Sequence, residues 1–279
     1  DSPSSDDSPS SDDDSPLIYH TAWFCPFAHR CTLALSHHSL PHTPVESLGW
    51  SKRPSSDGQT THDHWYHYKN PDLLAANPLG MVPTLVQGSK VCTESLACID
   101  FVDAMGEGTS LIPADPWEAA RCRVWSEKVA KDLCSPYYKI LVNQDADVQA
   151  QAFEGLKASI VRFGEEVEKT EGDLFAGEGL CNVDLSLFPW AWRYYVFEHY
   201  RGPNFAVTPQ SLSAKEYTPF FRWLDAMLDL DAVVKTLPDK DRYLEHIGKY
   251  ADGSARSKVA EAVRRGVEAH EYDDVKDLK

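Results

Sequence analysis

Residues 17–40 read LIYHTAWFCPFAHRCTLALSHHSL, and this stretch decides how the first half of the chain folds. The apolar run at 17–19 predicts a short strand, and residues 20–24 read as a turn. Pro26 suits the first position of a helix, where its missing N–H costs nothing, and good helix formers follow it. We therefore expect a strand, a turn and a helix, with Cys25 at the helix N-cap.

Cys25 is the first candidate for chemistry. A thiol is a useful nucleophile only as a thiolate, and the unpaired N–H groups and partial positive charge at a helix start favour an anion. A buried, inert thiol is the alternative. Three residues on stands Ala28 rather than a second cysteine, and Cys31 points to another face of the helix. An exposed single thiol of this kind must be resolved by an external thiol.

Two further motifs lie downstream. Met81–Val82–Pro83 opens a strand, and a cis bond at Pro83 would leave the Val82 backbone free to pair with an extended peptide. Thr93–Glu94–Ser95 opens the next helix. Ser95 and the helix N–H groups suit a carboxylate, and Glu94 suits an ammonium group; a plain helix cap is the alternative.

The chain divides by composition into four parts. Residues 1–16 are Asp, Ser and Pro, and we expect a disordered acidic tail. Over 17–105 the elements follow the order β-α-β-α-β-β-α, with a long polar surface loop at 49–65 and a short helix near Pro71. A linker rich in Gly and Pro at 106–116 precedes an all-helical part, 117–279, whose central buried helix is Val183 to Tyr195.

The net charge and the number of cysteines limit the classes of partner and the cellular compartment. The formal charge is −16, from 27 basic and 43 acidic side chains, which disfavours nucleic acid and anionic membranes as partners. No apolar run is long enough to span a bilayer. Seven scattered cysteines without a CxxC motif do not resemble a secreted disulfide framework. We expect a reducing compartment and a cytoplasmic protein.

The motifs CPFAHR (25–30), NPLGMVPTL (77–85) and ESLACIDFVD (94–103), in this order and spacing, resemble the omega-class glutathione transferases and their cysteine-type relatives. The resemblance covers residues from about 17 to 250. It implies an α/β thioredoxin-like N-terminal domain followed by an all-α C-terminal domain, the glutathione transferase architecture. It also implies a homodimer, glutathione as a substrate and no metal.

The resemblance further assigns roles to single residues. Cys25 would form a mixed disulfide with glutathione. The other positions would bind the tripeptide: Phe27 and the Val82–Pro83 turn beside the cysteinyl unit, Glu94 and Ser95 at the γ-glutamyl end, and Lys69, or Asn70 if the gap falls differently, at the glycyl carboxylate.

A second substrate needs an apolar pocket beside Cys25, which the helical part should supply. Aromatic residues at helical spacing are more often core, so each candidate is weak alone. The candidates are Trp125, Tyr137, Tyr138, Trp190, Arg193 and Tyr194.

Other polar side chains are expected to be structural. His62, His64 and His67 have a spacing seen in metal sites, but nothing completes the ligand set, so we expect no metal there. We expect His29 to be a partly exposed helix residue rather than a modulator of the Cys25 pKa, and Arg30 to pack in the helix interface against an acid.

Together these observations predict a glutathione-dependent thiol transferase acting on mixed disulfides, dehydroascorbate or glutathionyl ketones. A glutathionyl-hydroquinone reductase is a rival: CPFAHR is close to that family's motif and His29 favours it, although Phe27 stands where a Trp is usual. A ligand carrier with an inert site and an interaction protein of transferase shape are alternatives from other classes.

Overall fold

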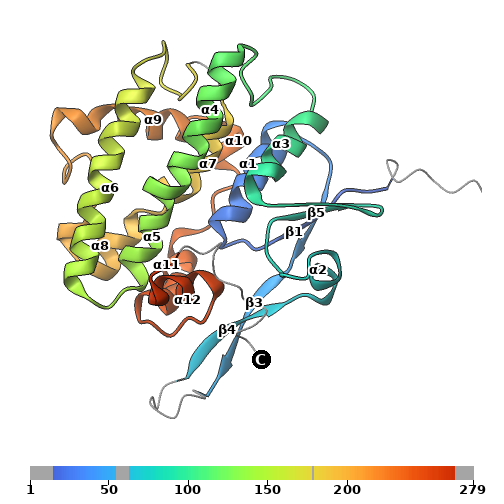
Figure 1. Ribbon diagram of the computed structural model, residues 1–279, viewed down its shortest axis with the longest axis horizontal. Helices are drawn as coiled ribbons and strands as arrows, with labels where there is room; N and C mark the ends of the chain where they lie inside the picture. The colour runs from blue at the N-terminus through green and yellow to red at the C-terminus, as the bar shows by residue number, and fades with distance from the viewer. Residues whose placement is uncertain (1–14, 55–62, 178, 268–279) are drawn as a thin grey trace, which may run out of the picture.

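The computed structural model describes residues 15–54, 63–177 and 179–267. Its first part has a mixed four-stranded sheet in the order β2-β1-β5-β6, with β1 parallel to β2 and antiparallel to β5 (Figure 1). The elements of this part are β1 (Ile18–Thr21), α1 (Pro26–His37), β2 (Thr43–Glu46), β3 (Leu48–Arg53), β4 (His64–Lys69), α2 (Pro71–Ala76), β5 (Thr84–Gln87), β6 (Lys90–Thr93) and α3 (Ser95–Met105).

The predicted loop at 49–65 was wrong at its two ends, because residues 49–53 belong to β3 and residues 64–65 to β4, and these strands pair as an antiparallel ribbon. Residues 55–62 lie outside the described residues. β3 pairs with β4 in the register that sets Trp50 against His67 and Lys52 against Trp65. The stretch looked like a loop because Gly, Pro and Ser dominate it, but Trp65, Tyr66 and Tyr68 are residues with high strand propensity. The ribbon extends away from the four-stranded sheet (Figure 1).

The described residues after Pro116 form helices. They are α4 (Pro116–Val129), a π-helical turn (Ala130–Cys134), α5 (Ser135–Val142), α6 (Ala146–Val167), α7 (Asn182–Ala191), α8 (Tyr195–Arg201), two 3₁₀ turns (Pro203–Phe205 and Lys215–Tyr217), α9 (Thr218–Leu228), α10 (Asp231–Val234), α11 (Lys240–Ala251) and α12 (Lys258–Arg265).

Helix α7 is the buried centre of this part, although it ends four residues before Tyr195, where the expected helix ended. Every residue of α7 is buried. At its start the carboxylate of Asp184 accepts hydrogen bonds from the Cys181 N–H (2.9 Å), the Phe175 N–H (3.0 Å) and the Trp223 indole (2.8 Å). The buried carboxylate of Asp184 thus links the start of α7 to the segment at Phe175 and to α9 at Trp223.

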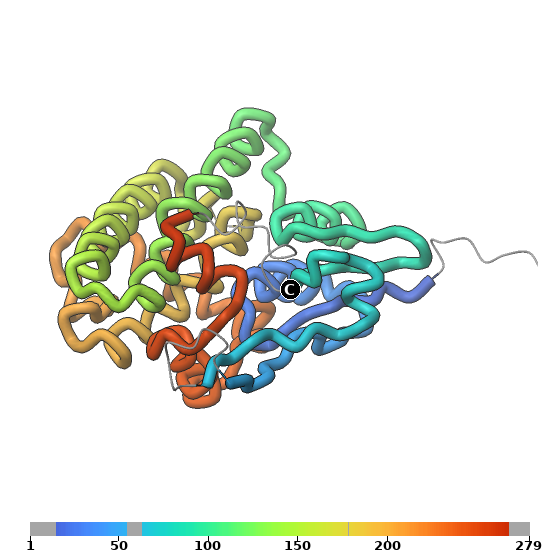
Figure 2. Tube along the Cα trace, turned by 60° about the horizontal axis from the view of Figure 1, so that its bottom comes forward, coloured from blue at the N-terminus to red at the C-terminus, as the bar shows by residue number. Residues whose placement is uncertain are grey.

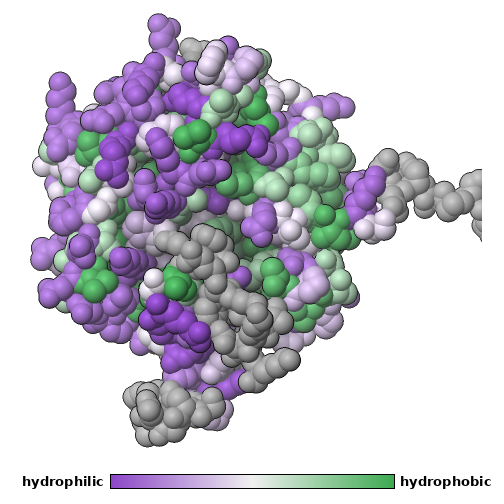
Figure 3. Space-filling view, viewed as in Figure 1, coloured by the Kyte–Doolittle hydropathy of each residue, from purple (hydrophilic) through white to green (hydrophobic). Residues whose placement is uncertain are grey.

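Helix α1 joins the two parts, because it packs against α3 on one side and α7 on the other. Cys25, at its start, therefore lies where the sheet meets the helices. In the view of Figure 3, polar side chains cover most of the helical part. Within the described residues, no helix combines the length and the apolar character needed to cross a bilayer.

Candidate functional site

Cys25 is the N-cap residue of α1, as predicted. Its backbone is extended (φ −79°, ψ 118°) and Pro26 occupies the first turn. The Cys25 N–H donates to the carbonyl of Ala22 at 2.9 Å, and its own carbonyl accepts from the His29 N–H at 2.9 Å. The turn before the helix and the first helical hydrogen bond therefore fix the backbone that carries the thiol.

The Cys25 side chain is half-buried and lines a cavity of about 270 Å³. Burial raises the pKa of its thiol, while the backbone N–H groups of Ala28 and Phe27 and the guanidinium groups of Arg193 and Arg30 lower it without cancelling that effect. We expected an exposed, readily ionised thiol, so the structure corrects the degree of exposure. The helix start does stabilise the thiolate, but in competition with desolvation.

The predicted glutathione-binding residues lie together. Phe27, Lys69, Val82, Pro83, Glu94 and Ser95 all line the same cavity as Cys25. The Val82–Pro83 bond is cis. Asn70, the alternative to Lys69, instead caps α2 by accepting the Asp72 N–H at 2.8 Å.

The turn into α3 has an unusual backbone. Glu94 is its N-cap residue and lies at φ 67°, a conformation that costs a non-glycine residue free energy. Ser95 is buried, and its hydroxyl oxygen accepts a hydrogen bond from Arg30 Nη1 at 3.1 Å. That bond leaves the Ser95 hydroxyl hydrogen available to donate to another group.

The predicted second-substrate residues are mostly elsewhere. Tyr138 lines the cavity, but the other five do not. Trp125 packs on Phe163 and Phe175 at 6.3 and 5.7 Å between ring centroids. The remaining four are buried in the helical core, which is the usual place for aromatic residues at helical spacing; they are Tyr137, Trp190, Arg193 and Tyr194.

The apolar half of the cavity has a different origin. It is built around Phe24, which precedes the thiol, together with residues from β4, α11 and the end of the chain. Those residues are His67, Tyr243, His246, Ile247, Tyr250, Ser257, Lys258 and Val259. The neighbour Phe24 was visible beside Cys25 in the sequence, whereas no local pattern marks residues that lie over 200 positions away.

Two histidines form part of this wall. The ring of His246 stacks on Phe24 at 3.9 Å between centroids, and its Nδ1 accepts the Trp50 indole N–H at 3.3 Å. The centroids of the His67 and Trp50 rings are 4.2 Å apart. Burial lowers the pKa of both His67 and His246 to about 3, so both rings are neutral at physiological pH.

These shifts predict how stability depends on pH. In the unfolded chain the two imidazoles bind protons below about pH 6.5, whereas in the folded chain they stay neutral down to about 3. Unfolding therefore takes up protons in this window, and each histidine lowers the free energy of unfolding by about 1.4 kcal/mol per pH unit below pH 6.5. Urea denaturation between pH 7.5 and 5 measures the slope.

The His246→Phe variant should lose one histidine's share of that slope. His199, which is exposed, supplies the control: His199→Gln should keep the wild-type slope. Equal slopes in His246→Phe and the wild type would contradict the assignment.

Residues that follow α11 form one wall of the cavity. Trp65 of β4 pairs with residues 254–256, donating its N–H to the Ser254 carbonyl (3.0 Å) and accepting from the Arg256 N–H (2.7 Å). Figure 2 shows this segment, in red, lying where the helices meet the sheet part. We call residues 254–265 the C-terminal strap.

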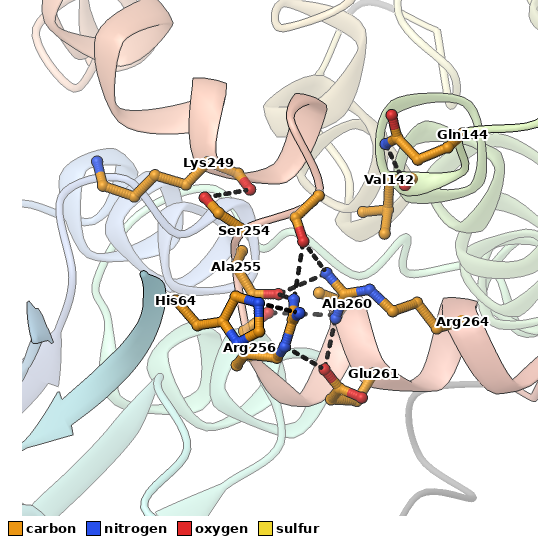
Figure 4. A network of polar contacts seen from close by, with 12 residues as sticks. His64, Val142, Gln144, Lys249, Ser254, Ala255, Arg256, Ala260, Glu261 and Arg264 are labelled. Atoms are coloured by element: carbon orange, nitrogen blue, oxygen red, sulfur yellow. Dashed lines mark hydrogen bonds and ion pairs between the residues drawn. The ribbon is translucent and has the colours of Figure 1, made fainter. Parts of the chain in front are cut away.

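Side chains reinforce the strap (Figure 4). The Arg256 guanidinium contacts His64 Nε2 at 2.6 Å and the Glu261 carboxylate at 3.6 Å, and Arg264 also pairs with Glu261. His64 and His67 are three residues apart on β4 and so point to opposite faces; His62 lies outside the described residues. Among the described side chains, no group of three or more His, Cys, Asp or Glu is placed to hold a metal ion.

The expectations for His29 and Arg30 need correction. His29 is buried: its Nε2 contacts Thr236 Oγ1 at 2.8 Å and its Nδ1 contacts Arg193 Nη1 at 3.0 Å. Arg30 is buried without the expected acid; its guanidinium donates to the Ser186 carbonyl (2.9 Å), to Ser95 and to Cys134 Sγ (3.6 Å), and it stacks over Trp190. Hydrogen bonds and ring contacts replace a carboxylate around this cation.

Comparison with known proteins agrees with this geometry. Residues 24–105 match the family described as "Glutathione S-transferase, N-terminal domain". The chain has the glutathione transferase fold. Its solved neighbours include glutathione transferase Omega 3C from Trametes versicolor (TM-score 0.67, 24% identity, 85% of this chain and 90% of that one). The Tau-class enzyme of mango superposes with a TM-score of 0.68 at 19% identity, over 85% of this chain and 99% of that one.

The curated relatives are also glutathione transferases. Glutathione S-transferase U3 of Arabidopsis thaliana is 22% identical over 82% of this chain and 91% of its own length. Glutathione transferase GST 23 of Zea mays is 28% identical over 63% of this chain and 76% of its own length. These likenesses confirm the expected fold. They do not single out the omega class, because the solved neighbours include both Omega-class and Tau-class enzymes.

Proposed function

We propose that this glutathione transferase homologue is a glutathione-dependent thiol transferase of the cysteine type. The observation that carries the proposal is the position of Cys25 at a helix start inside a cavity with two unlike halves. One half presents Lys69, Glu94 and Ser95, and the other presents aromatic rings. A charged tripeptide and an apolar group joined to its sulfur would fit the two halves.

Glutathione would lie with its charged ends on opposite charges. The γ-glutamyl carboxylate would accept hydrogen bonds from the Ser95 hydroxyl and from the first N–H groups of α3. The Glu94 carboxylate would pair with the ammonium group of the γ-glutamyl unit. Lys69 would meet the glycyl carboxylate; its ammonium group donates to the Leu79 carbonyl at 2.8 Å, which holds it at the cavity wall. The Val82 backbone would pair with the cysteinyl unit and Phe27 would border it. The cysteinyl sulfur would then be placed beside Cys25.

The reaction has two thiol–disulfide exchange steps. In the first, the Cys25 thiolate attacks the glutathione sulfur of a mixed disulfide, so that the bond to the substrate sulfur breaks and the substrate leaves as a thiolate that takes up a proton. In the second, a glutathione thiolate attacks the Cys25–glutathione disulfide and releases oxidised glutathione. A glutathionyl ketone would enter the first step in the same way: the bond between the glutathione sulfur and the α-carbon breaks, and the ketone leaves as an enolate that takes up a proton.

Two alternative functions, a glutathionyl-hydroquinone reductase and a non-catalytic ligand carrier, are each addressed by one observation. A glutathionyl-hydroquinone reductase was favoured by His29, but that ring is bonded to Thr236 and Arg193 and does not line the cavity. A non-catalytic carrier of aromatic ligands is favoured by the raised pKa of Cys25. Comparing turnover of a glutathionyl-hydroquinone with that of hydroxyethyl disulfide tests the first rival.

The pH dependence of iodoacetamide labelling tests the second rival. A reactive enzyme thiol should have an apparent pKa below that of free Cys, about 8.5, once glutathione analogues are bound.

The γ-glutamyl contact gives a quantitative prediction. Ser95→Ala removes a hydrogen bond to a charged group, which is worth about 1.5–3 kcal/mol, so the KM for glutathione should rise at least about tenfold. The kcat at saturating glutathione should change much less. Ser126→Ala, which removes another buried hydroxyl bonded within α4, should leave the KM unchanged, and an unchanged KM in Ser95→Ala would remove Ser95 from the site.

The assembly and the setting stay expectations. A homodimer is supported by exposed apolar side chains at the end of α3 and on α4, namely Met105, Trp117 and Val124; sedimentation equilibrium tests it. A reducing compartment such as the cytoplasm is supported by seven cysteines that are all free thiols.

Mass spectrometry after treatment with oxidised glutathione tests the central proposal. We expect one glutathionyl group on Cys25, removed again by reduced glutathione. Failure of Cys25 to accept the group, with the cavity otherwise able to bind S-methylglutathione, would favour the carrier.

A further inference from the structure

A second pair of thiols lies next to the proposed glutathione site. Cys92 is in β6 and Cys98 is in α3, and their sulfur atoms are 3.9 Å apart. The Cys98 thiol also points at the Cys92 carbonyl, at 3.8 Å. The five residues between them include Glu94 and Ser95, which line the cavity. We propose that Cys92 and Cys98 are a disulfide-forming pair whose oxidation by a low-molecular-weight disulfide weakens glutathione binding.

The two thiols differ in their exposure to solvent, and this difference decides which one reacts first. Cys92 is half-buried, so a small oxidant can reach it, whereas Cys98 is fully buried. In the first step the Cys92 thiolate attacks oxidised glutathione, forming a Cys92–glutathione disulfide and releasing one reduced glutathione. In the second step the Cys98 thiolate attacks the Cys92 sulfur and releases the second glutathione. Two electrons pass from the pair to oxidised glutathione, and excess reduced glutathione reverses both steps.

The bond would disturb the turn between the two thiols. A disulfide needs sulfur atoms at about 2.05 Å, so the two side chains must turn towards each other, and we expect β6 and the start of α3 to be drawn together with them. That movement acts on a turn whose N-cap residue, Glu94, already lies at φ 67°. Because Ser95 and the first N–H groups of α3 hold the proposed γ-glutamyl contacts, their displacement should weaken binding. This consequence rests on the proposed function, whereas formation of the disulfide does not.

The chemistry of the pair sets its rate. A hydrogen bond with Cys98 and burial raise the pKa of Cys92. A hydrogen bond with Cys31 and burial raise the pKa of Cys98, and its hydrogen bond with Cys92 only partly offsets that rise. The thiolates are therefore scarce at neutral pH, and oxidation should be slower than that of Cys25 and should accelerate with rising pH. The pair would respond to sustained rather than brief oxidation.

The chain contains a matched internal control. Cys122 and Cys181 have sulfur atoms 4.0 Å apart, almost the same separation, but both are fully buried. The hydrogen bond between these two thiols lowers the pKa of Cys122, whereas burial raises that of Cys181. If access decides the outcome, only Cys92 and Cys98 will be oxidised.

The experiment uses the full chain carrying Cys25→Ser, so that the proposed catalytic thiol cannot react. The protein is incubated with oxidised glutathione, its free thiols are alkylated, and disulfide-linked peptides are mapped by mass spectrometry. We expect a Cys92–Cys98 link with the loss of two hydrogens. Adding Cys98→Ala should stop the reaction at one glutathionyl group on Cys92, and adding Cys92→Ser should prevent it.

Binding is then measured with S-methylglutathione, a thioether that cannot reduce the disulfide. We expect at least about fivefold weaker binding after oxidation and full recovery after reduction with a phosphine. Absence of the Cys92–Cys98 link, or a link between Cys98 and Cys31 or between Cys122 and Cys181 instead, would overturn the pair. A link without a change in affinity would overturn its effect on the site. Failure of the reduced protein to bind S-methylglutathione would count against the proposed function alone.

Discussion

Replacing Cys25 with Ser should lower glutathione-dependent reduction of hydroxyethyl disulfide by at least about 10³-fold. A hydroxyl at this position cannot form the mixed disulfide that both exchange steps need. The N-cap backbone that carries residue 25 is fixed by the Ala22 carbonyl and the His29 N–H, so the fold and the tripeptide contacts should survive. We therefore expect the loss in kcat, with the affinity for S-methylglutathione within about twofold of the wild type.

The control for this loss is another cysteine of the same helix. Cys31 is fully buried in α1 and does not line the cavity, so Cys31→Ala should keep the thiol-transferase activity of the folded protein. If Cys25→Ser keeps the wild-type rate, the thiol transferase assignment is wrong.

The same variant bears on the proposed reaction, because the solved neighbours include both Omega-class and Tau-class glutathione transferases. A serine hydroxyl at the helix start can donate a hydrogen bond to the thiolate of bound glutathione instead of attacking it. If the ancestral chemistry is conjugation, Cys25→Ser should retain or gain turnover of an aryl halide while it loses disulfide reduction. Measuring both reactions on one preparation separates a cysteine-type enzyme from a conjugating one.

The parts of the site that were predicted from the sequence are those set by local chemistry. Pro26 after Cys25 fixes a helix start, and the Glu94–Ser95 pair opens the next helix through its own backbone; both motifs line one cavity in the structure. Their meeting depends on a β-α-β-α-β-β-α order that the apolar runs already indicated. The fold was therefore predictable from short segments and their order.

The apolar half of the cavity was not predictable in the same way. His246 and Tyr250 line the cavity together with Phe24 only because α11 returns to the sheet, and Val259 lines it only because Trp65 pairs with the strap. Such contacts are between residues distant in sequence, and no periodic pattern marks them. The choice of Trp125, Tyr137, Trp190 and Tyr194 followed helical spacing, which selects core positions rather than cavity walls.

Arg30 shows a third kind of error, because its burial was predicted but its partner was not. The Arg30→Met variant should lower the free energy of unfolding by about 3 kcal/mol, because it removes charge-assisted hydrogen bonds to the Ser186 carbonyl and to Ser95. The Ser186 carbonyl then keeps only the weaker side-chain contact from the Cys134 thiol at 3.7 Å. Stacking of the guanidinium over Trp190, at 4.5 Å from the ring centroid, would also be lost. Urea denaturation measures the change.

The charge of Arg30 can be separated from its shape. Arg30 lowers the pKa of the Cys25 thiol, so Arg30→Met should shift the pH dependence of Cys25 alkylation to higher pH. Arg30→Lys keeps the charge but not the planar fork that reaches α3 and α7 together. It should therefore lose much of the stability while keeping the alkylation profile closer to that of the wild type. If both variants raise the apparent pKa of Cys25 equally, Arg30 acts on the thiol through packing alone, and the electrostatic part of the account fails.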